Sequence, residues 1–197
     1  KERMWATVFK DEIGELETDE EAAGFWRSET EISPEHIAYF GRKDNFWEMA
    51  DIGPCGPCSE IHYDKGPQAC NRQGVPGHVC QVNGDCERFI ELWNLVFIQY
   101  NKDADGALHP LPAKHVDTGA GFERLVAVLQ GLDSNYQTDL FMPIIRRVQE
   151  MVGHTDAEVA ENIVAYRVIA DHGRAITFLI GDGVLPGNEG RNYVLRM

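Results

Sequence analysis

The sequence contains no apolar run long enough to span a bilayer, and its charged first residues do not resemble a secretory signal peptide. Basic residues are scarce, with 18 Lys and Arg against 32 Asp and Glu and a formal net charge of −14. The five cysteines are an odd number without secretory context, so we expect no disulfide framework. These absences favour a cytoplasmic protein with reduced thiols and no membrane partner.

The shortage of basic residues argues at first against a nucleic-acid partner. The acids are concentrated, however, because residues 11–35 hold ten of them against Arg27 alone, a local charge of −9. Residues 162–197 hold four arginines against three acids. We interpret the acidic segment as solvated surface, which weakens the argument against RNA binding.

The length of 197 residues allows a sizeable core, in one domain or one and a half. The chain opens at Lys1 and stops at Met197 inside a helix-like pattern. We therefore expect it to be part of a larger protein.

The stretch 113–131 reads as a short strand, a turn over Thr118–Gly121 and a helix that ends near Gly131. Gly119 and Gly121 carry no Cβ, so a ligand can approach the backbone closely. The helix start offers free N–H groups to an anion, and Arg124 adds a planar donor fork suited to phosphate. Asp117 is an acceptor suited to an amine. An ordinary strand-to-helix turn with a solvated arginine is the alternative interpretation.

Other patterns predict strands, turns and helices on both sides of this stretch. Strands are predicted at Met4–Phe9, Ser59–Tyr63 and Phe89–Tyr100, a helix at Asp19–Arg27 capped by Thr18, and loops over 53–58 and 64–86. Asn94 is a polar amide among aliphatic residues, so it either satisfies a structural network or faces a ligand. A turn at Asp105-Gly106 would pair its strand with the strand of Asp117, and the two side chains could then enter one cleft.

Beyond Gly131 the periodicity becomes helical. Leu140–Val152 carries Pro143 near its first turn, and Thr155 with Glu158 has capping-box spacing. A long helix interrupted by Gly173 ends at 181–183, and another begins at Asn188. The sequence predicts an α+β domain over 1–131 and a helical domain over 132–197.

The cysteines leave two interpretations open. Cys55-x-x-Cys58 has zinc-knuckle spacing, and the cysteines and histidine further along the chain could complete a set of ligands. Four soft ligands occupy one loop that otherwise lacks a core, namely Cys70, His78, Cys80 and Cys86. This second set predicts a possible Zn²⁺ site, with inert loop thiols as the alternative.

Six blocks in fixed order resemble the alanyl-tRNA synthetase family of class II aminoacyl-tRNA synthetases. They are 45–60, which contains NFWEMADIGPCGPCSE, 91–101 (ELWNLVFIQYN), 116–124 (VDTGAGFER), 134–141 (SNYQTDLF), 170–180 (ADHGRAITFLI) and 182–196 (DGVLPGNEGRNYVLR). The resemblance implies an antiparallel class II sheet followed by the start of a tRNA-recognition domain. It also implies activation of alanine with ATP and Mg²⁺, then transfer to tRNA(Ala).

The resemblance also implies roles for individual residues. Asp117 would hold the alanine ammonium, Asn94 its carboxylate, and Trp47 would wall the pocket. Gly119 and Gly121 would leave room for the adenylate, Arg124 would meet ATP phosphates, and Asn188 would approach the tRNA acceptor stem.

Several features separate this chain from a complete family member. The first two class II motifs are absent, so we expect the isolated chain to be inactive. Ala120, Phe122, Gln137 and Gly173 depart from the family's pattern, and Gly187 and Asn192 replace a serine and a glycine. A non-catalytic RNA-binding or regulatory paralogue is the alternative. An editing hydrolase is excluded, because no two histidines stand four residues apart as its zinc motif requires.

Overall fold

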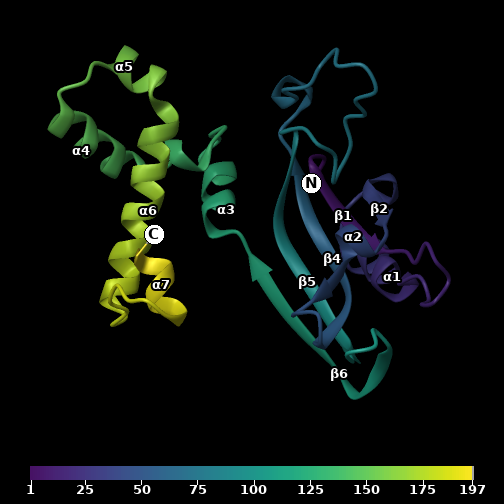
Figure 1. Cartoon of the computed structure of the whole chain (residues 1–197). Helices are drawn as coiled ribbons and strands as arrows, with labels where there is room; N and C mark the ends of the chain where they lie inside the picture. Colours follow the sequence, from purple (N-terminus) through teal and green to yellow (C-terminus); the bar gives the residue numbers. More distant parts are fainter. Residues whose placement is uncertain (197) are drawn as a thin grey trace. The chain divides into compact units, whose positions relative to one another are not determined.

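The computed structural model describes residues 1–196. The chain divides into two compact units, one formed by Lys1–Leu125 and the other beginning at Val126. The first unit holds the strands, and the second consists of helices (Figure 1). No helix within the described residues is long and apolar enough to cross a membrane.

The first unit is built on a six-stranded sheet in the order β2-β1-β4-β5-β6, with β3 paired to β4. The strands are β1 (Met4–Phe9), β2 (Ile37–Phe40), β3 (Phe46–Glu48), β4 (Gly53–Asp64), β5 (Phe89–Lys102) and β6 (Leu108–Ala120). All pairs are antiparallel except β1 with β2. The expected α+β class with a largely antiparallel sheet is thus confirmed.

One face of this sheet is covered by α1 (Glu20–Glu29). The helix and the sheet enclose one hydrophobic core cluster. Its buried residues are Val8, Ala22, Ala23 and Ile37, and Trp26, Ile32, Tyr39 and Phe97 pack against them. The N-cap of α1 is Asp19, whose carboxylate accepts the N–H of Ala22, so the prediction of Thr18 as the cap was wrong. The opposite face of the sheet is therefore the one available for a site.

The segment predicted as a Gly/Pro loop, 53–58, is instead the first half of β4. Pro57 is tolerated because the register shifts between Cys55 and Cys58, where an irregularity frees the backbone from strict pairing with β5. Gly56 lies so close to β5 that a Cβ there would stand 2.0 Å from the carbonyl oxygen of Phe97. Composition indicated a loop, but close strand packing requires these small residues.

The strand-to-helix transition is tighter than the sequence suggested. Thr118–Ala120 still belong to β6, and Gly121 alone precedes α3 (Phe122–Leu129). Gly131, predicted to follow the end of this helix, has a φ of +68°, the conformation in which glycine commonly ends a helix. The predicted four-residue turn was wrong, because Thr118 and Gly119 continue the pairing with β5.

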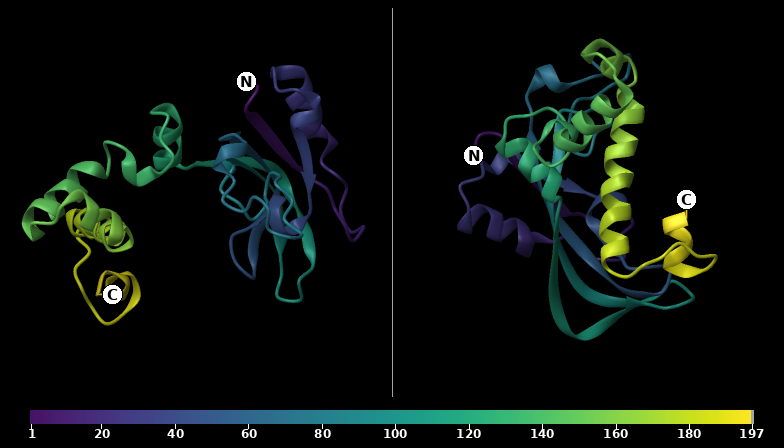
Figure 2. Two further views of the ribbon diagram at one scale, coloured as in Figure 1. Left: turned by 90° about the horizontal axis from the view of Figure 1, so that it is seen from above. Right: turned by 90° about the vertical axis from the view of Figure 1, so that its left-hand side faces the viewer.

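Among the described residues the longest helix is α6 (Ile163–Gly181), drawn in yellow-green in Figure 2. The core of the second unit lies between α6 and α4 (Met142–Val152). Phe141, Ile145, Tyr166 and Ala170 are its buried residues. The remaining helices are α2 (Arg42–Asn45), α5 (Asp156–Glu161) and α7 (Gly190–Arg196), with 3₁₀ turns at Pro34–His36, Pro67–Ala69 and Asn135–Gln137.

The capping signals of the second unit are confirmed. Pro143 lies in the first turn of α4, and Thr155 with Glu158 forms a capping box at α5. The expected interruption at Gly173 was wrong, since α6 runs through it. Packing around the buried Tyr166 and Ala170 outweighs the loss of helix propensity at one glycine.

Candidate functional site

Asn94 and Asp117 project from the same face of two paired strands. Asn94 of β5 is the register partner of Gly119 on β6, and Asp117 is the partner of Val96. Directly opposed residues share a face, so the amide and the carboxylate lie diagonally across the β5–β6 pair. The predicted antiparallel pairing is confirmed, and it brings the two side chains to one face, away from α1.

The side-chain oxygen of Asn94 on β5 makes no hydrogen bond to the described residues. This oxygen, Oδ1, is buried. An unpaired buried oxygen of this kind costs about 1–3 kcal/mol. Asp117, by contrast, is exposed and accepts the N–H of Thr118 at 2.8 Å through Oδ1. The pair offers one half-buried amide and one accessible carboxylate.

Cys58 of β4 lies in the same row across the sheet as Asp117, because Val96 of β5 is the register partner of both. Burial and the neighbouring Glu60 carboxylate raise the pKa of Cys58 to about 12, although the amides of Asn94 and Asn45 act in the opposite direction. Burial likewise raises the pKa of Cys55. Among the described residues, neither thiol belongs to a group of three or more ligand atoms close enough to hold a metal ion, so the zinc-knuckle interpretation of Cys55-x-x-Cys58 finds no support in the structure.

A buried polar network continues along the same face, and the sequence analysis missed it. Oε2 of Glu60 accepts from Thr7 Oγ1 at 3.2 Å and from Asn83 Nδ2 at 3.3 Å, and lies 2.9 Å from His62 Nε2. Asn45 Nδ2 donates to Thr7 Oγ1 at 2.7 Å. The alternation of Glu60 and His62 with Ile61 and Tyr63 was the available signal. These residues form a buried hydrogen-bonded network on the sheet face next to Asn94, because Glu60 is the register partner of Asn94 on β4.

Arg124 is held at the beginning of β5. Its Nη1 donates to the carbonyl oxygen of Glu91 at 2.9 Å and to Oε2 of Glu91 at 3.2 Å. A Cβ at Gly121 would stand 2.9 Å from Cδ of Arg124, so glycine gives this side chain its room. A cavity of about 380 Å³ opens beside the guanidinium, and its other lining residues include His62, Asn83 and Glu91.

The remaining predicted site residues occupy separate places. Nothing lies within 4 Å of a Cβ built on Gly119, so the space above it is open. Trp47 of β3 pairs with Gly56 of β4. Asn188 belongs to the second unit, is exposed, and accepts a hydrogen bond from Arg196.

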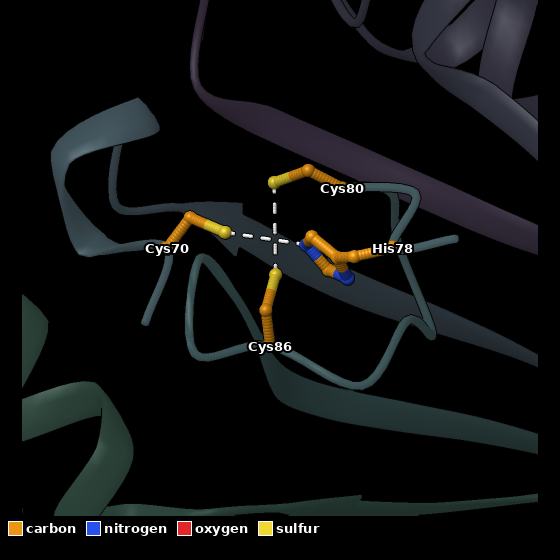
Figure 3. A group of neighbouring side chains, drawn as sticks. All are labelled: Cys70, His78, Cys80 and Cys86. Carbon is orange, nitrogen blue, oxygen red and sulfur yellow. Dashed lines mark hydrogen bonds between the residues drawn. The ribbon is translucent and has the colours of Figure 1, made fainter. Parts of the chain in front are cut away.

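The four predicted soft ligands converge in the loop between β4 and β5 (Figure 3). The ligand atoms of Cys70, His78, Cys80 and Cys86 all lie within 4.8 Å of one another. The cluster is compatible with Zn²⁺, whose structural sites take four Cys and His ligands.

The whole chain is similar in sequence to one known family. The model of the tRNA synthetases class II (A) matches residues 1–197. Proteins named alanine–tRNA ligase match the entire chain at 55% identity in Chlorobaculum tepidum and 52% in Chlorobium chlorochromatii, each over 21% of the relative's length. A third, from Anaeromyxobacter sp., is 53% identical over 22% of its length. The chain thus spans about a fifth of the curated relatives it matches.

Proposed function

Because this chain belongs to the class II (A) tRNA synthetases, we propose that it forms part of an alanine–tRNA ligase. In this proposal, residues 1–131 belong to the aminoacylation domain and 132–197 begin a helical domain that recognises tRNA(Ala). The protein acts in the cytoplasm on alanine, ATP and tRNA(Ala). The diagonal placement of Asn94 and Asp117 on one sheet face is the observation that carries it.

Alanine is a small zwitterion, so its site needs an anion and a polar donor a short distance apart. Asp117 receives the ammonium group, since a carboxylate forms strong charge-assisted hydrogen bonds with it. Asn94 meets the carboxylate with its amide N–H groups. The neutral Cys58 thiol on the neighbouring strand β4 adds no competing charge. Trp47 closes the pocket around the methyl group.

ATP occupies the space beside Arg124 and above Gly119. The guanidinium fork neutralises phosphate oxygens, and Mg²⁺ shares that charge. Glu91 holds Arg124 in place before ATP arrives, because it accepts two of its hydrogen bonds. The open position at Gly119 leaves room for the adenylate next to the amino-acid site.

The reaction proceeds in two transfers. A carboxylate oxygen of alanine attacks the α-phosphorus of ATP, the bond to the bridging oxygen breaks, and pyrophosphate leaves. A terminal hydroxyl of the tRNA then attacks the carbonyl carbon of alanyl-adenylate, and AMP leaves. Arg124 stabilises the charge on phosphate during the first transfer, and Asp117 keeps the ammonium fixed throughout. Asn188 contributes to tRNA binding in the second.

Calorimetry with a non-hydrolysable alanyl-adenylate analogue tests this proposal. We expect the chain to bind the analogue and Asp117→Asn to weaken binding at least about tenfold, since a hydrogen bond to a charged group contributes about 1.5–3 kcal/mol. Asp105→Asn, an exposed acid at the tip of the same β5–β6 hairpin, is the matched control and should bind normally. Equal binding by the Asp117 and Asp105 variants would contradict the role of Asp117.

A further inference from the structure

The loop between β4 and β5 brings four soft ligand atoms close together, all within 4.8 Å of one another. Sγ of Cys70 lies 3.2 Å from Nε2 of His78, and Sγ of Cys80 lies 3.6 Å from Sγ of Cys86 (Figure 3). A tetrahedral zinc ion with Zn–S near 2.3 Å and Zn–N near 2.0 Å places its ligand atoms about 3.5–3.8 Å apart. A disulfide would bring two sulfurs to about 2.05 Å, so the cysteines are thiols.

His78 is oriented independently of the sulfurs. Its Nδ1 lies 2.9 Å from Oδ1 of Asp85, and Asp85 is also paired with Arg72. A carboxylate that accepts the Nδ1 proton fixes the tautomer in which Nε2 presents a lone pair, the arrangement seen around histidines that bind zinc. The His78 side chain is only 6% exposed. The imidazole nitrogen facing Cys70 is thus prepared as a ligand.

The surroundings of the cluster suit a bound cation with three thiolates. Three thiolates and Zn²⁺ carry a net charge of −1, and Nη1 of Arg88 lies 3.8 Å from Sγ of Cys80. Arg88 is itself held by both carboxylate oxygens of Asp64, at 2.7 and 2.6 Å. This contact ties the cluster to the last residue of β4.

We propose that Cys70, His78, Cys80 and Cys86 bind one structural Zn²⁺, which folds the loop that walls the cavity beside Arg124. Zinc fits because three sulfurs and one nitrogen complete a tetrahedral site without an open position. Binding displaces three thiol protons to solvent, and the metal supplies the cohesion that a small apolar core cannot. Within residues 65–88, Cys70 and Val82 are the buried residues.

The zinc site acts on the cavity through the residues between its ligands. Asn83, held at a φ of 54°, donates to the buried Glu60, and Asn83, Gly84 and Glu87 line the cavity with Arg124. Cys80 and Cys86 flank Asn83 and Gly84, and Glu87 directly follows Cys86. The zinc site itself does not depend on the synthetase function, whereas its importance for ATP rests on that proposal.

Metal analysis of the purified chain tests the site directly. From cells grown with added zinc, we expect about one Zn per chain, as a four-ligand structural site requires. Cys80→Ser and Cys86→Ser should each reduce the content at least about fivefold, because each removes one of only four ligands. Cys55→Ser is the matched control, a buried thiol of β4 outside the cluster, and it should keep full zinc. Asp85→Ala, which removes the partner of His78 and of Arg72 but none of the four ligands, should weaken zinc affinity by about 10–100-fold.

A second measurement removes any dependence on the folding of the variants. Chelation of the unmodified protein should expose residues 70–86 to limited proteolysis while β5 remains protected. Zinc near zero in the unmodified chain, or a Cys80–Cys86 disulfide found by mass spectrometry, would overturn the inference. Full zinc in Cys80→Ser would overturn it as well. Zinc at one equivalent without binding of the adenylate analogue would instead reject the proposed function and leave the metal site intact.

Discussion

Asn94 of β5 and Asp117 of β6 lie on one face of the sheet but are not direct partners, since Asn94 opposes Gly119 and Asp117 opposes Val96. Gly119, opposite Asn94, has no side chain to cover the amide from β6, and Val96, opposite Asp117, has no side-chain group that could form a competing hydrogen bond. Diagonal neighbours on adjacent strands have Cα atoms about 7–8 Å apart, which is enough to place one small zwitterion between them.

The first prediction concerns the charge at position 94. Asn94→Asp keeps the size of the side chain but places a carboxylate where the carboxylate of alanine is proposed to bind. We expect alanine affinity to fall at least about tenfold, because like-charge contacts cost several kcal/mol. Alaninamide, which lacks that charge, should be affected much less. Calorimetry with alanine and with alaninamide distinguishes charge repulsion from general damage to the fold. Equal losses of affinity for the two ligands would indicate damage to the fold.

The second prediction concerns the guanidinium fork. Arg124→Lys keeps the positive charge but removes the planar donors that meet phosphate oxygens and Glu91. We expect the affinity for Mg–ATP to fall by about tenfold, since Lys does not replace Arg at a bidentate site. Equilibrium dialysis measures it. Arg147→Lys is the control, because Arg147 is exposed on α4 and paired with Glu150. An unchanged affinity in Arg124→Lys would remove Arg124 from the ATP site.

The sequence predicted those parts of the fold whose signals are local. The strand pair β5–β6 followed from an apolar run, a turn at Asp105-Gly106 and a second strand. The capping box of Thr155 and the position of Pro143 also followed from short-range rules. This pairing places Asn94 and Asp117 on one face of the sheet, so the centre of the candidate site could be predicted from the sequence.

The parts that escaped prediction depend on contacts between distant segments. Gly56 favours a loop by composition, yet it belongs to a strand because the backbone of Phe97 occupies the space of a side chain. The buried carboxylate of Glu60 accepts hydrogen bonds from Thr7 and Asn83, which lie far from it in the sequence, so its part in the network could not be predicted. The cysteine spacing suggested ligand types, but only the folded loop brings their atoms together.

The third prediction tests the close approach of β4 and β5. Gly56→Ala places a Cβ against the carbonyl oxygen of Phe97, and neither backbone can yield without breaking the pairing. We expect the free energy of unfolding to fall by about 1–3 kcal/mol or more, as for overpacking in a core. Gly24→Ala in α1 is the control, since nothing lies within 4 Å of the new Cβ. It should be neutral or stabilising by about 0.5–1 kcal/mol. Urea unfolding measures both, and similar values would refute the steric argument.

The fourth prediction concerns two departures from the family's pattern that lie in contact. A Cβ on Gly187 would stand 2.8 Å from Cβ of Asn192, and the N–H of Gly187 donates to the carbonyl of Asn192 at 3.0 Å. Glycine at 187 thus makes room for the side chain at 192. Gly187→Ser should therefore destabilise the second unit, and adding Asn192→Gly should recover part of the loss. A double-mutant cycle by thermal unfolding should give a coupling of about 0.5–3 kcal/mol, and strict additivity would show that the pair is independent.

The fifth prediction concerns the acid stability of the β4–β5 hairpin. The Arg88 guanidinium hydrogen-bonded to Asp64 lowers the pKa of that carboxyl below its usual 3.8. Since the folded pKa is the lower one, the stabilisation is present above the unfolded value and is lost as pH falls through the folded pKa. Asp64→Asn should therefore cost about 1.5–3 kcal/mol near pH 7, the contribution of a hydrogen bond to a charged group. The free energies of unfolding of the two proteins should become equal below about pH 2, because the wild-type carboxyl is then protonated as well.

The control is Asp51→Asn, an exposed acid just before β4, whose free energy of unfolding should equal that of the wild type at every pH. Urea unfolding from pH 7 to pH 2 measures all three proteins, and a deficit of Asp64→Asn that stays constant with pH would show that the charge of Asp64 is not what Arg88 stabilises.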